Sequence, residues 1–261
     1  MMGTQPAADL VASLPRLDSP RTGDRIVDDL FTRAAALKRP GQSSVICVGE
    51  PHATPAMLGV YDRLFAQARG RGFRHLALEV PPTMKGFVER KTGELDAAIR
   101  KAGGLSAHFE SLTPQQREDT FPFVTMLLAR KHGLKPIYAD HPSSDDMGVR
   151  NQTMVAAIAK YTDAGHDVIS LNGALHSNDM QHLIDERSQR RGRGPSVTSI
   201  AFVREQSHPK IRKHLVHLFR EQAPRADRSS FFVIDPAFAD HLTVPAALQV
   251  SSGRCTRPSS A

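Results

Sequence analysis

The feature that most constrains the fold is a regular alternation of short apolar runs with longer stretches of helical periodicity. Such alternation is typical of strands joined by crossover helices. The short runs are β-branched or Leu-rich, as expected for parallel strands covered on both sides. We therefore predict a three-layer α/β fold with a mainly parallel central sheet, helices on both faces, and room for an antiparallel edge strand. The predicted strands are Ser44–Val48, His75–Val80, Pro136–Ala139, Asp167–Leu171, Val197–Val203 and Phe231–Ile234.

Helix starts are predicted where a Ser or Thr stands before a proline, because the hydroxyl caps free amides and proline suits the first turn. The three starts of this kind are Thr54-Pro55, Thr113-Pro114 and Ser207 with Pro209. The first of these helices is expected to end near Gly70 and to leave free amide donors close to His52. Apolar periodicity predicts four more helices, near residues 24–38, 84–102, 145–163 and 177–190.

The chain has 261 residues and is 40% hydrophobic, which suits one α/β domain with a substantial core. We place that domain at residues 24–250. Residues 1–23 are polar and contain prolines, and residues 251–261 are small and polar. Because neither end can bury much apolar surface, both are predicted to be flexible.

The formal net charge of +7 is spread along the sequence. Its densest part is Arg187, Arg190, Arg191 and Arg193, a stretch without the interleaved aromatics on which bases stack. We interpret it as a solvated loop and expect no nucleic-acid partner. Oligomeric state cannot be read from the sequence.

The compartment is predicted from cysteines and apolar runs. The two cysteines give neither a disulfide framework nor a zinc pattern, which favours a reducing compartment. No segment approaches the ~18 uninterrupted apolar residues of a membrane span, and the N-terminus has no apolar core of an export signal. We therefore expect a cytoplasmic protein without a membrane span.

Polar residues collect where four predicted strands end, in the segments VICVGEPH, HLALEVPP, PIYADHP and VISLNGALH. Ligands of open α/β sheets bind in the crevice at the carboxyl ends of strands. Pro51 holds Glu50 extended, so Glu50 and His52 are predicted to share one face. Glu79 follows a buried run and needs a cation, imidazole, arginine or metal as its partner. His176 supplies a second imidazole.

Each of these residues also has a purely structural interpretation. Glu50 could cap a helix, His52 could be a turn histidine, Glu79 could pair with a structural arginine, and His176 could be an exposed helix start. Two Glu and two His at one sheet edge are harder to explain by capping alone, so we predict a functional site.

A second group of polar residues follows the third strand: Asp140, His141, Arg150 and Asn151. Arg150 could neutralise a site carboxylate or lie on the surface. The sequence contains no G-x-S-x-G elbow, no phosphate-binding G-x-x-x-x-G-K-[ST] loop, no G-x-G-x-x-G after a strand and no H-E-x-x-H. Serine hydrolases, P-loop NTPases and Rossmann enzymes are therefore disfavoured.

The ordered segments VICVGEPHATPAM, LALEVPP, RNQTMVAAI and LNGALH resemble the motifs of the erythromycin-esterase/ChaN-like (TIKI) superfamily. The GExH form of the first motif is closest to that of ChaN-type domains. By this resemblance, Glu50, His52, Glu79 and His176 are the polar centre, and Arg150 supports it. Members of the superfamily hydrolyse a macrolactone, act as metal-dependent proteases or bind haem.

The function predicted first is hydrolysis of an ester, lactone or amide, with a small molecule or a peptide as the substrate. In a metal-free version, His52 is the general base, oriented by Glu50 or Glu79, while His176 or Arg150 stabilises the oxyanion. In a metal version, the ligands are His52, His176 and Glu50, with one position left for water. The alternative is a haem- or iron-binding protein without catalysis, with Tyr61 and Tyr138 near the motif segments.

Overall fold

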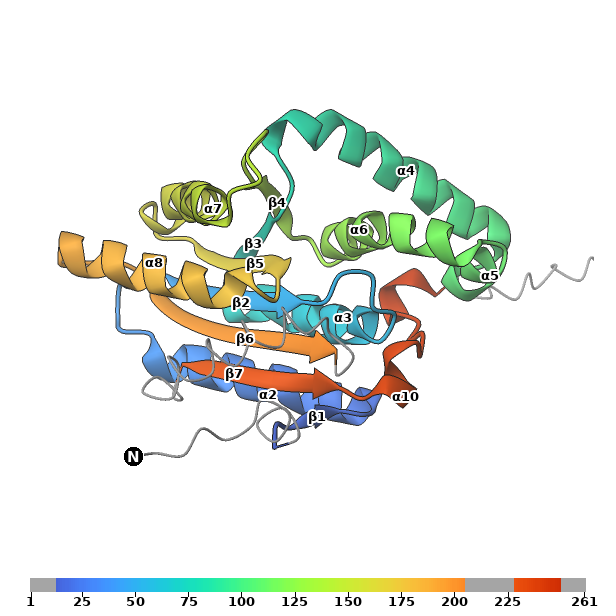
Figure 1. The fold of residues 1–261 in the computed structure, drawn as a ribbon, viewed down its shortest axis with the longest axis horizontal. Helices are drawn as coiled ribbons and strands as arrows, with labels where there is room; N and C mark the ends of the chain where they lie inside the picture. The colour runs from blue at the N-terminus through green and yellow to red at the C-terminus, as the bar shows by residue number, and fades with distance from the viewer. Residues whose placement is uncertain (1–12, 205–227, 250–261) are drawn as a thin grey trace, which may run out of the picture.

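The computed structural model describes residues 13–204 and 228–249. Its strands form one seven-stranded sheet in the order β1-β7-β6-β2-β5-β3-β4, and every pairing between neighbours is parallel (Figure 1). The predicted parallel α/β fold is therefore confirmed, without an antiparallel edge among the described strands. The strands are β1 (Arg16–Leu17), β2 (Ser44–Glu50), β3 (Phe73–Leu78), β4 (Lys135–Tyr138), β5 (Asp167–Gly173), β6 (Ser196–Arg204) and β7 (Ser229–Ile234).

Helices cover both faces of the sheet. Helices α7 and α8 pack against one face, whereas α2, α3 and α6 pack against the other, and α4 and α5 lie outside α6. The helices are α2 (Pro20–Leu37), α3 (Met57–Ala68), α4 (Lys85–Ala102), α5 (Leu105–Glu110), α6 (Pro114–Lys131), α7 (Met147–Thr162), α8 (His176–Arg191) and α10 (Pro236–Ala239). Short 3-10 turns are η1 (Arg69–Arg71), η2 (Pro82–Met84) and η4 (Ala246–Leu248).

The strands are apolar on both faces because each face has its own core. In β2, Val45 and Cys47 join the core beneath α7 and α8, whereas Ile46 and Val48 join the larger core beneath α2 and α3. Successive side chains of a strand point to opposite faces, so a strand between two helical layers must be apolar throughout. This explains the short uninterrupted apolar runs of the sequence.

The prediction of a flexible segment over residues 1–23 is wrong for residues 13–23. Leu17 is fully buried, and β1 pairs with Val233 and Ile234 of β7. Ser19 caps α2, which starts at Pro20, several residues before the predicted start at 24. A two-residue strand is too short to show periodicity, which is why the sequence pattern missed it. The predicted tail at 251–261 lies outside the described residues.

The predicted start of the helix after β2 is also wrong. Thr54 does not cap it; instead the Thr54 hydroxyl donates to the carbonyl of Pro51, and α3 begins at Met57. The amides of Ala56, Met57 and Leu58 donate to the carbonyls of Ala239, Thr54 and Pro55. These amides are therefore not free to bind an anion beside His52.

Other helix predictions are confirmed within a few residues. Thr113 and Gln116 form a reciprocal capping box at the start of α6, with Pro114 in its first turn. The turn after α3 ends at Gly72, whose φ of 93° is left-handed. Helices α4, α7 and α8 match the predicted ranges closely. The helix predicted from Ser207 lies outside the described residues.

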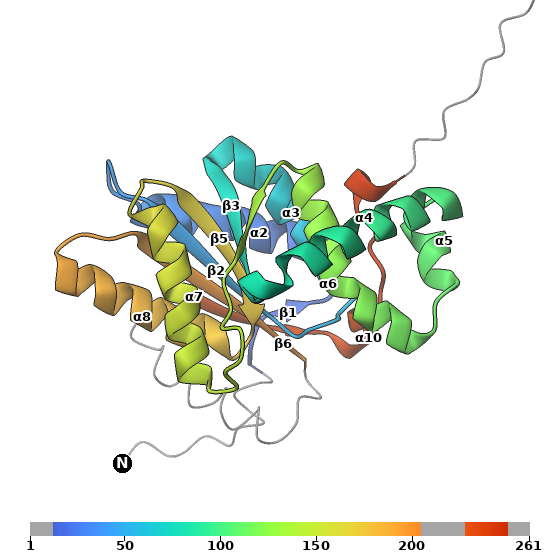
Figure 2. The same cartoon turned by 90° about the horizontal axis from the view of Figure 1, so that it is seen from above.

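The chain arrangement creates a crevice between β2 and β5. After β2 the chain leaves to α3 on one face, whereas after the adjacent β5 it leaves to α8 on the other. Ligands of open parallel sheets bind where neighbouring connections diverge in this way. Figure 2 shows α4, α5 and α6 on the side toward which the strands run, so these helices form an outer wall beyond the strand ends. No helix of residues 13–204 and 228–249 is long and apolar enough to cross a membrane.

Candidate functional site

The last residues of β2 and β5 bring the predicted site residues together. Glu50 lies opposite Gly173 in the sheet register, and the amide of Ala174 donates to the carbonyl of Glu50 at 2.9 Å. Glu79 follows the end of β3, on the other side of β5. The carboxyl ends of three strands thus carry Glu50, Glu79 and Gly173 on one edge, with His176 at the first position of α8.

Gly49 allows the chain after β5 to approach β2 closely. A Cβ atom at Gly49 would overlap the hydroxyl of Ser177 and stand 2.9 Å from the Cα of Ala174. The Ser177 hydroxyl also accepts a hydrogen bond from the Asn172 side chain at 2.9 Å. A side chain at this position would therefore push the start of α8 away from the crevice.

Substitution Gly49→Ala is expected to destabilise the protein by about 1–3 kcal/mol, because the backbone at Ala174 must move to accept the methyl group. Chemical denaturation of both proteins measures this change in the free energy of unfolding. Gly70→Ala is the matched control, since nothing lies within 4 Å of a Cβ placed there. Equal stability of the two variants would contradict the close approach at Gly49.

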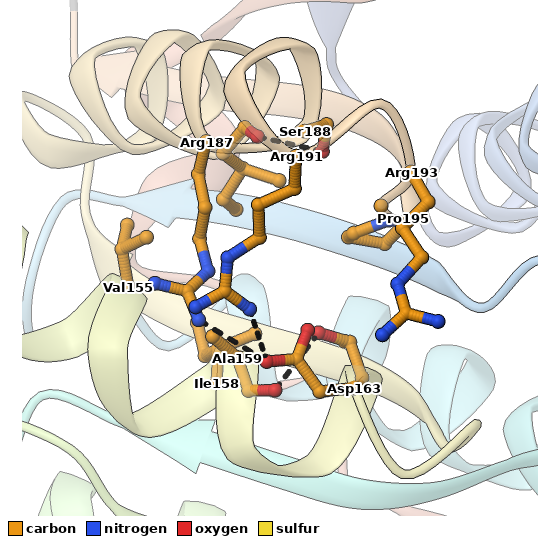
Figure 3. A pocket seen from close by; sticks show the side chains of 12 residues that line it. Val155, Ile158, Ala159, Asp163, Arg187, Ser188, Arg191, Arg193 and Pro195 are labelled. Carbon is orange, nitrogen blue, oxygen red and sulfur yellow. Dashed lines mark hydrogen bonds and ion pairs between the residues drawn. The ribbon is translucent and has the colours of Figure 1, made fainter.

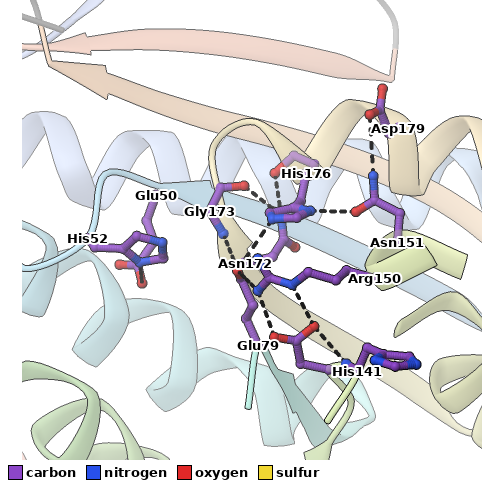
Figure 4. A network of polar contacts seen from close by, with 12 residues as sticks. Glu50, His52, Glu79, His141, Arg150, Asn151, Asn172, Gly173, His176 and Asp179 are labelled. Carbon is purple, nitrogen blue, oxygen red and sulfur yellow. Dashed lines mark hydrogen bonds and ion pairs between the residues drawn. The ribbon is translucent and has the colours of Figure 1, made fainter. Parts of the chain in front are cut away.

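Glu79 is held by Arg150, His176 and one backbone amide. Its Oε1 accepts from Arg150 Nη2 at 2.5 Å and lies 3.3 Å from His176 Nε2, while its Oε2 accepts from the Gly173 amide at 2.6 Å. Arg150 also donates through Nε and Nη2 to the buried Asp140, at 3.0 and 2.6 Å. The expectation that Glu79 has a cationic partner is confirmed, and Arg150 does neutralise a site carboxylate (Figure 4).

These partners keep Glu79 ionised. Burial by itself would raise the pKa of this carboxyl, but the hydrogen bond and charge of His176 and the Gly173 amide outweigh it, and the pKa falls to about 2. Conversely, the two carboxylates raise the pKa of Arg150. Glu79 is therefore a permanent anion at neutral pH and does not exchange protons with a substrate.

His176 is buried within the same network. Its Nδ1 meets Oδ1 of Asn151 at 2.5 Å, and the Nδ2 of Asn151 donates to Asp179 Oδ2 at 3.3 Å. Asn151 and His176 are only 1% and 6% exposed. His176 is thus not the exposed helix-start residue of the structural alternative.

Glu50 and His52 form a separate pair, as Figure 4 shows. Their Oε1 and Nδ1 atoms lie 3.7 Å apart, an ion-pair distance rather than a direct hydrogen bond. The His52 side chain is 69% exposed, whereas that of Glu50 is only 19% exposed. Burial raises the pKa of Glu50, and the neighbouring Glu50 carboxylate raises the pKa of His52. The predicted shared face of these two residues is confirmed.

The space between the Glu50–His52 pair and the Glu79 network lies over Gly173. A Cβ built on Gly173 would be 3.2 Å from His52 Nε2, 3.5 Å from Glu79 Oε2 and 3.5 Å from His176 Cδ2. Because glycine has no side chain, these three groups face a common position that a small molecule or a water can reach. His52 supplies the exposed nitrogen at this position.

A cavity of about 180 Å³ opens beside this position. Its polar lining comes from Glu50, His52, Glu79 and Asn172 near the strand ends, and from Glu118 and Thr125 of α6. Helices α4 and α6 supply an outer wall, and the cavity-lining residues of these helices are Val88, Glu118, Phe121, Pro122, Thr125 and Met126. The sequence analysis did not predict this wall, because its apolar residues Val88, Phe121 and Met126 have the pattern of ordinary core positions of amphipathic helices.

The metal ligands predicted from the sequence are not brought together. Within residues 13–204 and 228–249, no group of three His, Cys, Asp or Glu side chains is arranged to hold a metal ion. His176 uses its two ring nitrogens on Asn151 and Glu79, and His52 and Glu50 lie apart from it. The predicted set of His52, His176 and Glu50 therefore does not fit a metal in this arrangement.

The other residues singled out in the sequence have structural roles. His141 Nδ1 accepts from the amides of Ser143 and Ser144, which makes it a turn histidine. Tyr61 is buried in the core, and the Tyr138 hydroxyl donates to Glu89 at 3.4 Å, so neither tyrosine reaches the cavity. Asn151 was only a secondary candidate, and Asp179 was missed altogether, although it stands three residues after His176 in the first turn of α8.

The arginine-rich stretch is mostly helical, so its interpretation as a loop is wrong. Arg187, Arg190 and Arg191 lie in the last turns of α8. Figure 3 shows Arg187 and Arg191 directed at Asp163, at 3.1 and 2.7 Å, across a hollow of only about 10 Å³. These ion pairs join α8 to the end of α7. The hollow has room for about one water molecule.

No protein-family model matches the chain, and no curated protein matches it. The structure of the type III effector HopBA1 is 18% identical with a TM-score of 0.44, covering 70% of this chain and 84% of that one. The structure of a putative LOR/SDH protein from Methanococcus maripaludis S2 is 13% identical with a TM-score of 0.34. The match covers 81% of this chain and 62% of that protein's chain. Neither likeness is strong enough to bear on function, so membership of the erythromycin-esterase/ChaN-like superfamily stays a prediction.

Proposed function

We propose that the chain is a hydrolase of esters, lactones or amides in which His52 activates water at the carboxyl edge of the sheet. The observation that carries this proposal is the arrangement over Gly173, where His52 Nε2 lies close to a backbone without a side chain, beside a cavity that His52 itself lines. A general base must lie within reach of the proton that it removes, and His52 Nε2 meets this condition for a water over Gly173. The motif resemblance to esterases agrees with this chemistry.

Glu50 assists His52 by its charge. As an ionised carboxylate beside Nδ1, it stabilises the imidazolium that forms when His52 accepts a proton from water. Its own raised pKa reflects the cost of burying it, a cost that a protonated His52 offsets. The two residues therefore act as a dyad, with the exposed His52 toward the substrate and Glu50 behind it.

Arg150 and His176 act mainly by holding Glu79, rather than by donating directly to an oxyanion as the sequence led us to expect. The Nε and Nη2 donors of Arg150 point to Asp140 and Glu79, and the His176 ring faces Gly173 through carbon Cδ2. Glu79 in turn fixes the Gly173 amide. The network keeps the floor of the site rigid beneath the reacting position.

The cavity favours a small apolar substrate portion. Its volume of about 180 Å³ is below the ~300–1,000 Å³ of pockets that enclose drug-sized ligands. Val88, Phe121 and Met126 provide an apolar wall for an acyl or alkyl group. A haem would not fit this volume, and neither Tyr61 nor Tyr138 lines the cavity, so the hydrolase is the better supported function.

A screen of the purified protein against simple esters, lactones and peptides tests the proposal. With an accepted substrate, Glu50→Gln is expected to lower kcat/KM about 10- to 100-fold, since the dyad loses its charge. It should also lower the pKa of His52, so that the acid limb of the pH–rate profile moves to lower pH. Glu94→Gln, on the exposed surface of α4, is the matched control. Hydrolysis that Glu50→Gln leaves unchanged in rate and pH dependence would contradict the dyad.

A further inference from the structure

His176 lies in the centre of a chain of polar contacts that runs from Asp140 through Arg150, Glu79, His176 and Asn151 to Asp179. The link from Glu79 to His176 is an ion-pair contact at 3.3 Å, and the other links are hydrogen bonds. Figure 4 shows the ring of His176 between Asn151 on one side and the carboxylate of Glu79 on the other. These contacts join the residues that follow β3 and β4 to residues of α7 and α8. What each member donates or accepts decides the protonation of the His176 ring.

Asp179 fixes the orientation of the Asn151 amide. A carboxylate only accepts hydrogen bonds, so it must face the NH₂ group of Asn151, and the Asn151 carbonyl oxygen then faces His176. Asp179 lies in the first turn of α8, where the helix dipole favours a negative charge. With a carbonyl oxygen as its neighbour, Nδ1 of His176 must carry a proton and donate it.

The second ring nitrogen also faces an acceptor. His176 Nε2 lies 3.3 Å from Oε1 of Glu79, a carboxylate that also accepts from Arg150 and from the Gly173 amide. A lone pair on Nε2 would repel this carboxylate, whereas a proton there forms a charge-assisted contact. Both nitrogens of His176 are thus placed to donate.

We propose that Asp179 and Asn151 are positioning residues that hold His176 as a doubly protonated imidazolium against Glu79. An imidazolium has no lone pair for a metal, so this arrangement favours metal-free chemistry at the site. In the hydrolase, His176 is then a fixed positive charge, and proton exchange is left to His52. The inference concerns the site of the proposed function, but its geometry does not depend on that reaction.

The charges around His176 agree with this assignment. Glu79, after the end of β3, and Asp179, on the same helix as His176, are carboxylates. Asp140, after β4, is paired with Arg150 of α7. His52, from the loop after β2, faces the carbon edge of the ring across Gly173 rather than its nitrogens. The two groups in direct contact with the ring nitrogens are therefore acceptors.

Nitrogen-15 NMR of the histidine rings in the full-length protein tests the proposal. An imidazolium gives two ring nitrogens of nearly equal shift, whereas a neutral ring gives two widely separated shifts. The His176 signals are assigned by their loss in His176→Gln. At neutral pH, we expect the imidazolium pattern in the wild type and in Asp179→Glu. In Asp179→Asn and Asn151→Leu, we expect the pattern of a neutral ring, because Nδ1 no longer faces an oriented carbonyl.

A neutral His176 in the wild type, or an imidazolium that persists in both Asp179→Asn and Asn151→Leu, would overturn the proposal. Asp179 is partly exposed, so Asp179→Asn remains informative where the buried Asn151→Leu does not fold. Adding one equivalent of zinc chloride should leave the His176 shifts unchanged, and a zinc-dependent shift would also overturn the proposal. These readouts need no substrate, so a failure of the hydrolase assignment stays distinguishable from a failure of this one.

Discussion

Substitution Glu79→Gln is expected to lower the free energy of unfolding at pH 7 by about 3–5 kcal/mol, the range found when one partner of a buried ion pair is removed. The amide keeps the shape of the side chain but removes the negative charge of Glu79, which both Arg150 and His176 contact. Urea denaturation of the wild type and the variant measures the difference. Glu94→Gln is the matched control, because Glu94 also contacts two cations, Arg90 and Lys91, but on the exposed surface. There we expect less than about 1 kcal/mol.

The pH dependence of stability gives this prediction a second readout. The pKa of Glu79 is about 2 in the folded protein, below its ordinary value of 4.5. Its contribution, on the order of 3 kcal/mol, is therefore fully present above pH 4.5 and is lost as the pH falls from 4.5 toward 2. In Glu79→Gln this part of the acid destabilisation should disappear. A variant that is as stable as the wild type at pH 7 and equally acid-sensitive would contradict the network.

The architecture could be predicted because it depends on a repeated pattern. Six strands and most helices followed from apolar runs, capping residues and prolines, since each buried face leaves a periodic record. The strand β1 left none, because Leu17 alone carries its burial. The start of α3 was misjudged because Thr54 uses its hydroxyl on Pro51, a local choice that competes with capping.

The site was predictable to the extent that it lies at strand ends. Glu50, Glu79 and His176 come to one edge because parallel strands bring their carboxyl ends together. The sequence did not predict which of these side chains contact one another, because that depends on the face of the sheet to which each connection leaves. The division into a Glu50–His52 dyad and a Glu79–His176 network therefore appeared only in the structure, and it separates the intended metal ligands.

This division assigns different chemistry to two histidines that look alike in the sequence. His176 is buried, and both ring nitrogens are occupied, so it has no freedom to take a proton from water. His52 is exposed, and its Nε2 faces the open position over Gly173. If the site hydrolyses a substrate, the rate should therefore depend on His52 as the base and on His176 as a fixed charge.

Substitution His52→Ala is expected to lower kcat/KM about 10²- to 10⁴-fold, the usual contribution of a general base. Because the side chain is 69% exposed, stability should change by less than about 0.5 kcal/mol. The wild-type rate should rise with pH through the raised pKa of His52, since only the neutral ring accepts a proton, and this rise should vanish in the variant. Added imidazole should restore part of the activity. His182→Ala, which removes an exposed histidine of α8, is the control.

Gly173→Ala tests the same position without removing an ionisable group. The backbone of Gly173 is not left-handed, so alanine is tolerated there, but its Cβ would lie 3.2 Å from His52 Nε2 and would keep a water from approaching that nitrogen over Gly173. We expect a loss of about 100-fold in kcat/KM at nearly unchanged stability, because misplacing reacting groups by about 1 Å has this effect. Gly86→Ala, with nothing within 4 Å of its Cβ, should leave both unchanged. Full activity in Gly173→Ala would place the reaction elsewhere in the crevice. If His52→Ala were also fully active, His52 would have no part in the reaction.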